Sequence, residues 1–207
     1  MVVLHYTAMR SADAACAALC DPARQVSAHY LICEDGTVWS LVPEAARAWH
    51  AGAGAWGDVT DVNSRSIGIE LAHPGAGPFA AAQMDALCHL LPGIMARWAI
   101  PPARVIGHSD MAPGRKIDPG PSFDWRRLAW LGLSVWPQPA GVTPPATAFR
   151  PLLTRIGYTA DADDATLLAA FRLRFRPRAT GPLSPADMVL IADLAARFPV
   201  DASAPRA

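Results

Sequence analysis

Short runs of alternating apolar residues recur along the first two thirds of the chain, and longer runs with a helical period separate them. The strand-like runs occupy residues 2–6, 28–33, 37–42, 66–72 and 104–107. Glu34, Asp35 and Gly36 join the second and third runs and predict a β-hairpin. Helical patterns follow Ser11 over residues 12–20, cover residues 79–99, and follow Asp124 to about residue 131. This mixture predicts one α/β domain built on a central sheet.

Proline interrupts the pattern in two places. Pro92 and Gly93 lie inside the helical pattern at 79–99 and predict that it kinks or splits. Residues 136–151 contain five prolines, which is typical of a linker. Helical patterns follow at residues 152–158, 164–175 and 184–198, the last opened by Ser184 and Pro185. We therefore predict an α/β domain over residues 1–135, a proline-rich linker over 136–151 and a small three-helix domain over 152–207.

The charge balance excludes two classes of partner. Lys and Arg together number 18, equal to Asp and Glu, so the formal net charge is zero. We therefore expect no binding to nucleic acid or to an anionic membrane surface. No apolar run approaches the roughly 18 residues of a membrane-spanning helix, and His5 and Arg10 interrupt any signal-peptide pattern. These features predict a cytoplasmic protein, whereas a start further upstream would allow a periplasmic or outer-membrane-associated one.

Two histidines and an aspartate are candidate metal ligands. His5 lies in the first predicted strand, His108 follows the strand at 104–107, and Asp118 lies 10 residues beyond His108. Two histidines and one carboxylate leave a zinc ion with an open coordination position, which is the composition of a catalytic site. A histidine at a strand end is also common as a hydrogen-bonded structural residue, so both interpretations stay open here.

Glu70 and Lys116 are the charged residues of interest near these candidates. Glu70 ends the apolar run SIGIEL, where a carboxylate is costly unless it is paired or lines a cleft. Lys116 is the single lysine of the chain, which otherwise uses arginine, and it lies two residues before Asp118. Catalytic zinc chemistry needs a carboxylate base and a cation for the developing oxyanion. An ordinary ion pair between Glu70 and Lys116 is the alternative.

The four cysteines, Cys16, Cys20, Cys33 and Cys88, form no CxxC pair. Cys16 and Cys20 lie one helical turn apart and could form a metal pair. This spacing is more typical of reduced thiols that pack in the protein interior, so an unrelated cysteine metalloprotein is only a remote alternative.

Five sequence segments carry a resemblance to a known family. They are HYTA at residues 5–8, SAHYLI at 27–32, WHAG at 49–52, NSRSIGIEL at 63–71 and GHSDMAPGRKIDPGPSFDW at 107–125. Together they resemble the zinc-dependent N-acetylmuramoyl-L-alanine amidases, which are related to the peptidoglycan recognition proteins. The resemblance covers about residues 2–131 and is strongest to the muropeptide-recycling, 1,6-anhydromuramoyl type.

The resemblance implies a mixed central sheet flanked by helices, with Zn²⁺ held by His5, His108 and Asp118. It also implies that Glu70 is the catalytic carboxylate and that Lys116 stabilises the oxyanion.

The same motifs suggest residues that bind the substrate. His50 and Asn63 match positions that line the muropeptide groove in such enzymes. Trp49 or Trp56 could stack on a sugar ring, with a place in the core as the alternative for Trp49. Arg115 could contact a substrate carboxylate, with an ordinary solvated arginine as the alternative. We interpret His29, which alternates with Tyr30 along its strand, as structural.

The C-terminal segments LLTRIGY and LLAAFRLRF resemble the small three-helix peptidoglycan-binding modules found in some amidases. Arg172 stands where such modules commonly have glutamine, and a helical cap packed on the catalytic domain is the alternative. We interpret the alternating arginines as a solvent-exposed basic edge; they are Arg172, Arg174, Arg176 and Arg178.

These observations favour a zinc hydrolase acting on peptidoglycan or muropeptides. The bond cleaved would be the amide between N-acetylmuramic acid, or its 1,6-anhydro form, and L-alanine. The alternative is a non-catalytic peptidoglycan-binding protein. Such a protein is expected to lose a metal ligand or the Glu70–Lys116 pair, and this chain keeps all of them.

Overall fold

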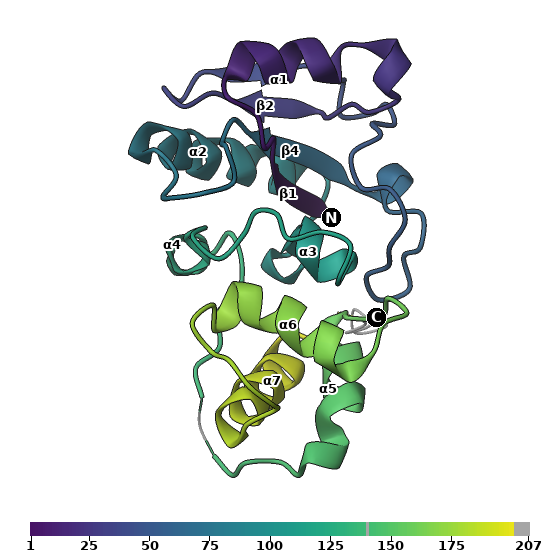
Figure 1. Ribbon diagram of the computed structural model, residues 1–207, viewed down its shortest axis with the longest axis vertical. Coiled ribbons are helices and arrows are strands. Elements are labelled where there is room, and N and C mark those ends of the chain that lie inside the picture. The colour runs from purple at the N-terminus through teal and green to yellow at the C-terminus, as the bar shows by residue number, and fades with distance from the viewer. Residues whose placement is uncertain (140, 201–207) are drawn as a thin grey trace.

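The computed structural model describes residues 1–139 and 141–200 (Figure 1). Five strands form one sheet in the order β3-β2-β4-β1-β5. They are β1 (Val2–Tyr6), β2 (Tyr30–Ile32), β3 (Val38–Ser40), β4 (Ile67–Leu71) and β5 (Val105–Gly107). All neighbours pair in parallel except β3, which runs antiparallel to β2 at one edge and completes the predicted hairpin. The expectation of a mixed sheet is therefore confirmed.

Helices surround this sheet, and none in the described ranges is long and apolar enough to cross a membrane. They are α1 (Ala12–Leu19), α2 (Ala81–Arg97), α3 (His108–Met111), α4 (Trp125–Trp130), α5 (Phe149–Ile156), α6 (Asp164–Phe175) and α7 (Pro185–Arg197). The predicted caps are present, because Ser11, Asp124 and Ser184 each accept a hydrogen bond from a backbone N–H of the first turn.

The predicted split at Pro92 and Gly93 is wrong, since α2 continues across both residues. Pro92 lies on the exposed side of the helix, whereas Leu87, Leu91 and Ile94 form a fully buried stripe. An internal proline costs about 3 kcal/mol. Each fully buried aliphatic side chain contributes about 1.5–3 kcal/mol, so the stripe outweighs the proline.

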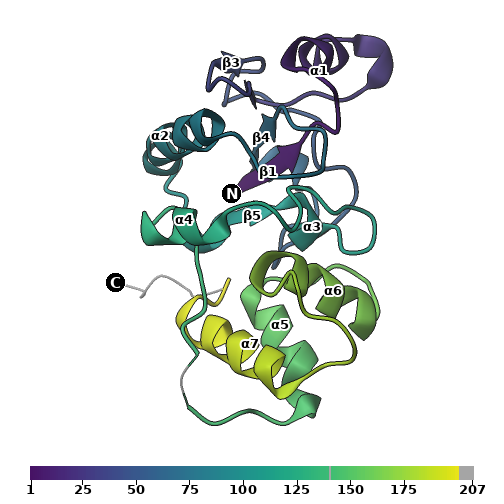
Figure 2. The same ribbon diagram turned by 60° about the vertical axis from the view of Figure 1, so that its left-hand side comes forward.

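The two faces of the sheet pack against different helices. α2 and α3 lie on opposite sides of β1 (Figure 2). Val2 and Leu4 of β1 pack with α2, whereas Val3 packs on the opposite face with α3. Because side chains alternate along a strand, His5 follows Val3 onto this second face. Glu70 of β4 is in register with His5 and faces the same way. His5 and Glu70 thus lie on the face of the sheet opposite α2.

The three C-terminal helices cover part of this second face (Figures 1 and 2). One apolar cluster joins Val3 and Ile106 of the sheet to Leu153 and Phe171 of α5 and α6. These contacts are those of a helical cap packed on the sheet-containing part of the chain. The division into domains stays a prediction.

The predicted linker differs from the structure at its end, because α5 begins at Phe149. Pro151 falls in the first turn of α5, where a missing backbone N–H leaves no hydrogen bond unmade.

The interpretation of the alternating arginines as an exposed edge is wrong for Arg172 and Arg174, which are 7% and 4% exposed. Arg172 pairs with Asp187 and Arg174 with Asp110, and both aspartates are fully buried. Residues two apart on a helix point to nearly opposite sides, so α6 sends one arginine toward α7 and the other toward α3. A buried guanidinium is tolerated because each has its own carboxylate.

Candidate metal centre

Three ligand atoms from distant parts of the chain meet at the carboxyl ends of β1 and β5. His5 Nδ1 lies 2.9 Å from His108 Nδ1 and 2.9 Å from Asp118 Oδ2. His108 Nδ1 lies 3.0 Å from the same carboxylate oxygen. Within residues 1–139 and 141–200, these side chains are the one group of three buried candidate ligands close enough to share a metal ion. The structure therefore brings the three predicted ligands together, and their donor set suits Zn²⁺.

Hydrogen bonds behind the cluster assign the tautomer of each histidine ligand. His108 Nε2 donates to the carbonyl oxygen of Ala51 at 2.8 Å, so Nδ1 carries no proton and its lone pair is free to bind a metal ion. Ser66 donates to the carbonyl oxygen of Val62, so its Oγ accepts from His50 Nε2. His50 Nδ1 then accepts from His5 Nε2 at 3.0 Å, and His5 Nδ1 also faces the cluster as a lone pair. Such outer hydrogen bonds orient metal ligands and fix their tautomers.

Close backbone packing holds His50 in this chain of hydrogen bonds. A Cβ at Gly68 of β4 would lie 2.3–2.6 Å from three atoms of the His50 ring, so only glycine fits there. His29 Nδ1 accepts from the Gly68 N–H, which supports the structural interpretation of His29. Asn63 Oδ1 accepts from the backbone N–H groups of His50 and Ala51.

The electrostatics of the cluster match what a metal ion requires. Burial and, after it, the neighbouring His108 together lower the pKa of His5 to about 4, against the opposing effect of Asp118. Burial disfavours ionisation of Asp118, but the neighbouring imidazoles of His108 and His5 outweigh it and hold the pKa of that carboxyl below its usual range. At neutral pH the cluster therefore offers a neutral imidazole at His5 and an ionised carboxylate at Asp118, the forms that bind metal.

Glu70 faces the same site with an unpaired oxygen. Its Oε2 is buried and has no hydrogen-bond partner among the described residues. Burial and the negative charge of Asp118 raise the pKa of Glu70 to about 8, against the opposing charge of Lys116. An unpartnered buried carboxylate with a raised pKa is destabilising, and such groups concentrate at functional sites.

Lys116 and Arg115 lie in the loop between α3 and Asp118. Both line a cavity of about 540 Å³ that also contains Glu70 and the three candidate ligands. Lys116 is exposed and forms no ion pair with Glu70 in the described structure, so the alternative of a simple salt bridge is not observed. The Arg115 guanidinium donates to the carbonyl oxygens of Ala51 and Ala53 and holds that loop.

The predicted substrate contacts fall into two groups. Trp49 lines the cavity and is 56% exposed, with the Arg47 guanidinium 4.5 Å from the centre of its ring. Asn63 does not line the cavity, because its side chain is buried against the backbone of residues 50–51. The suggestion that Trp56 stacks on a sugar is wrong, since Trp56 is 1% exposed and packs against Tyr158.

The alternative metal pair is not supported. The sulfur atoms of Cys16 and Cys20 lie 4.0 Å apart, and no group of three candidate ligands in the described residues includes either cysteine. All four cysteines are free.

Three functional features escaped the sequence analysis. Ser66, through His50, and the Ala51 carbonyl orient the candidate ligands His5 and His108, and Asp110 lies fully buried two residues after His108. Ser66 and Asp110 belong to the motifs NSRSIGIEL and GHSDMAPGRKIDPGPSFDW, so their positions within those segments were the available signal.

Comparison with known proteins places this geometry in a family. A family model described as N-acetylmuramoyl-L-alanine amidase matches residues 1–121. The N-acetylmuramoyl-L-alanine amidase AmiD of Escherichia coli K12 is 40% identical over 209 residues, covering 86% of this chain and 75% of AmiD.

Two solved structures resemble the whole chain. The complex of E. coli AmiD with the substrate anhydro-N-acetylmuramic acid-L-Ala-D-γ-Glu-L-Lys has a TM-score of 0.86 at 36% identity, and the match covers 96% of this chain and 89% of AmiD. AmpDh3 of Pseudomonas aeruginosa, in complex with an anhydromuramic pentapeptide, has a TM-score of 0.86 at 32% identity, with 96% and 92% coverage. The predictions of fold and enzyme class are thus confirmed, and the chain belongs to the N-acetylmuramoyl-L-alanine amidase family.

Proposed function

We propose that the protein is a zinc hydrolase that cleaves the amide bond between 1,6-anhydro-N-acetylmuramic acid and L-alanine in muropeptides. Family membership supports the bond, and the anhydromuramic peptides bound by the two structural relatives support the sugar. One observation carries the proposal: His5, His108 and Asp118 converge in a cavity that also contains the unpaired carboxylate oxygen of Glu70.

The residues present fit a zinc ion. Nδ1 of His5, Nδ1 of His108 and Oδ2 of Asp118 would hold it, and the hydrogen bonds to His50 and Ala51 keep both imidazoles in the required tautomer. When bound, zinc supplies the Lewis acidity that activates water and polarises the scissile carbonyl.

Glu70 is the proposed general base and acid. It accepts a proton from water as the new C–O bond forms, and it returns that proton to the nitrogen of L-alanine as the C–N bond breaks. The raised pKa of about 8 describes the site without a cation. A dication held by His5, His108 and Asp118 would oppose the charge of Asp118 and lower the pKa of Glu70, which would favour the ionised carboxylate that a base requires.

Lys116 is the proposed stabiliser of the oxyanion that develops on the carbonyl oxygen. It is the single lysine of the chain and lies in the same cavity, on the loop that ends at Asp118. An ammonium group offers three donors that reorient freely, whereas a guanidinium has a fixed planar fork.

We assign sugar stacking to Trp49, because a large part of its indole is exposed at the cavity rim. His50 and Asn63 act behind the ligands as positioning residues. Arg115 fixes the loop at residues 51–53, and a contact with a substrate carboxylate stays a prediction. The expectation of a cytoplasmic protein also stays a prediction.

The test is cleavage of defined muropeptides with and without the anhydro ring, followed by mass spectrometry of the products. We expect free anhydro-N-acetylmuramic acid and the intact peptide from the anhydro substrate. Prior removal of zinc by a chelator should abolish turnover, and added zinc should restore it. Unchanged turnover after complete zinc removal would exclude the proposed mechanism.

Matched variants separate the roles of the residues. Glu70→Gln should lower kcat by about 10²–10⁴-fold, whereas Glu44→Gln, which alters a glutamate that pairs with Arg97 outside the cavity, should leave kcat unchanged. His108→Ala should lose zinc, whereas His89→Ala, on the exposed side of α2, should keep it. Tight muropeptide binding without product by the zinc-loaded protein would favour the non-catalytic alternative.

A further inference from the structure

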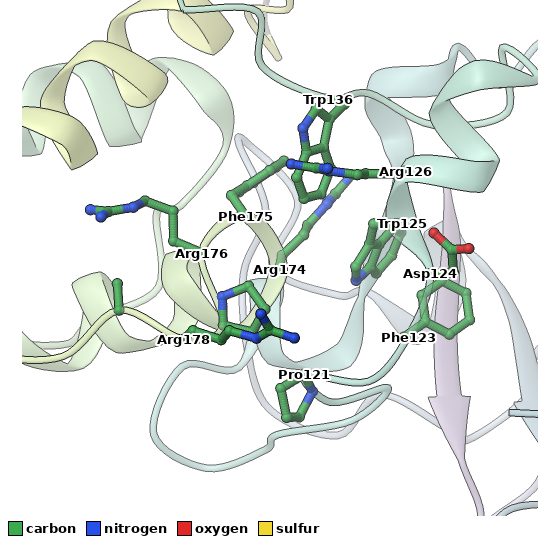
Figure 3. A pocket seen from close by; sticks show the side chains of 12 residues that line it. Pro121, Phe123, Asp124, Trp125, Arg126, Trp136, Arg174, Phe175, Arg176 and Arg178 are labelled. Carbon is green, nitrogen blue, oxygen red and sulfur yellow. The ribbon is translucent and has the colours of Figure 1, made fainter. Parts of the chain in front are cut away.

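The side chain of Arg174 extends from α6 toward β5 and α3, in the part of the chain that contains the candidate metal ligands. Its side chain is 3% exposed. The guanidinium donates to Asp110 at 2.7 Å, to Ser134 at 2.8 Å and to the carbonyl oxygen of Val105 at 3.3 Å. Figure 3 shows Arg174 among aromatic side chains, and its guanidinium carbon lies 4.1 Å from the centre of the Trp125 ring. One side chain thus contacts β5, α3 and the segment after α4.

Asp110 accepts a hydrogen bond from Arg174 and fixes the backbone turn that leads into His108. Asp110 lies on α3, two residues after His108, and is fully buried. Its Oδ2 accepts from Arg174 and from the backbone N–H of Gly107, while Oδ1 accepts from the Tyr158 hydroxyl at 2.6 Å. Gly107 ends β5 and directly precedes His108. Arg174 and Tyr158 of the C-terminal segment therefore fix the Asp110 carboxylate, and this carboxylate fixes the backbone directly before His108.

The C-terminal segment also contacts the loop at residues 51–57, which contacts the imidazole of His108. The backbone N–H of Gly57 donates to the carbonyl oxygen of Gly157 at 2.9 Å, and the Thr159 hydroxyl donates to the carbonyl oxygen of Gly57 at 2.8 Å. Tyr158 packs edge-on against Trp56, with ring centres 5.0 Å apart. This loop begins with Ala51, whose carbonyl oxygen accepts from His108 Nε2.

We propose that Arg174 and Tyr158, acting through Asp110, are positioning residues for the metal ligand His108. The C-terminal helices therefore help to position a metal ligand in addition to covering the sheet. This inference rests on the proposed function, because it assigns His108 to zinc.

Arg172 provides a matched control on the same helix. It is also buried, and it also pairs with a fully buried aspartate, Asp187, at 2.6 Å. That pair lies within the C-terminal helices, and the hydrogen bonds of Arg172 go to Asp187 and to the carbonyl oxygens of Gly181 and Pro182, not to β5 or α3. Losing either arginine leaves one aspartate buried with a partner missing, so both losses destabilise the fold. Only the loss of Arg174 is expected to change the position of His108, because of the two arginines only Arg174 bonds to Asp110.

The experiment measures zinc affinity by competition with a chromophoric chelator, together with the visible spectrum of the cobalt-substituted protein. We expect Arg174→Met to weaken zinc binding about 10–100-fold, the range for residues that orient a ligand, and to shift the cobalt spectrum. Arg172→Met should keep zinc affinity within about threefold of the wild type, with an unchanged spectrum, although its melting temperature falls as well.

Tyr158→Phe keeps the experiment decisive if Arg174→Met fails to fold. It removes one hydrogen bond to Asp110 and keeps the packing on Trp56, and it should weaken zinc binding several-fold. Zinc affinity and cobalt spectrum equal to those of Arg172→Met, in either variant, would overturn the inference. A wild-type protein that binds no zinc would contradict the proposed function itself, and this inference with it.

Discussion

Replacing Glu70 by glutamine should stabilise the zinc-free protein at alkaline pH, although the same change removes the proposed base. The pKa of Glu70 in the folded protein is raised from the ordinary value of 4.5 to about 8, chiefly by burial. The unfolded chain therefore releases this proton at lower pH than the folded protein does. The stability that the protonated carboxyl contributes is fully present below pH 4.5, and it is lost as pH rises toward and through 8.

The size of the effect follows from the interval between the two pKa values. One pKa unit corresponds to 1.36 kcal/mol, so the wild type loses at most about 5 kcal/mol of unfolding free energy over this window. Glutamine resembles the protonated carboxyl in shape and cannot ionise. The variant should therefore become progressively more stable than the wild type between about pH 5 and pH 8, and the difference should then level off.

The assay is urea unfolding of chelator-treated protein, followed by circular dichroism at several pH values from 5 to 9. Glu44→Gln is the control. The ion pair of Glu44 with Arg97, helped by hydrogen bonds from Tyr30 and Trp98, lowers the pKa of Glu44 to about 2. The stability that Glu44 contributes is lost only as pH falls from 4.5 toward 2, so its difference from the wild type should be constant across this range. A constant difference for Glu70→Gln as well would refute the burial of an ionisable, unpaired carboxylate.

Three further predictions concern the metal and its surroundings. Lys116→Arg should lower kcat about 100-fold or more without weakening zinc binding, measured by steady-state kinetics and chelator competition, because arginine keeps the charge but not the compact ammonium; parent-like kcat would contradict the role. Gly68→Ala should weaken zinc binding about tenfold, because the new Cβ would lie 2.3 Å from the His50 ring; unchanged affinity would mean that His50 does not position His5. Zinc removal should lower the melting temperature in calorimetry, and zinc should restore it, since an ion that binds only the folded state stabilises it; an equal melting temperature in both forms would argue against a metal site.

The three candidate ligands were predictable because each lies in a sequence segment that resembles the amidase family. His5 and Glu70 belong to strands whose alternation already indicates which residues share a face, and the structure pairs them in register. The convergence of Asp118 with them depends on a loop, and no periodicity in the sequence reports the path of a loop. Only the resemblance carried by the segment at residues 107–125 predicted it.

The errors have a common physical origin in contacts between residues far apart in sequence. Arg174 looks like a surface residue until Asp110, 64 residues earlier, is placed beside it. Pro92 looks like a break until the sheet covers the opposite side of its helix. Asn63 has a polar side chain in a conspicuous motif, but the polar groups it satisfies belong to the backbone of residues 50–51. In each case burial decides the outcome, and a local pattern does not report burial.

The apolar cluster shared by the sheet and the C-terminal helices bears on synthesis at the ribosome. β1 is translated before the other four strands, yet the face on which Val3 lies is covered by α5 and α6, which are translated after the whole sheet. A nascent chain stopped at residue 135 would hold Val3, Ile106 and Met111 against water, and such faces attract chaperones or other nascent chains. Because contacts of long sequence separation form slowly, the chain completes its apolar seal only after translation reaches α7.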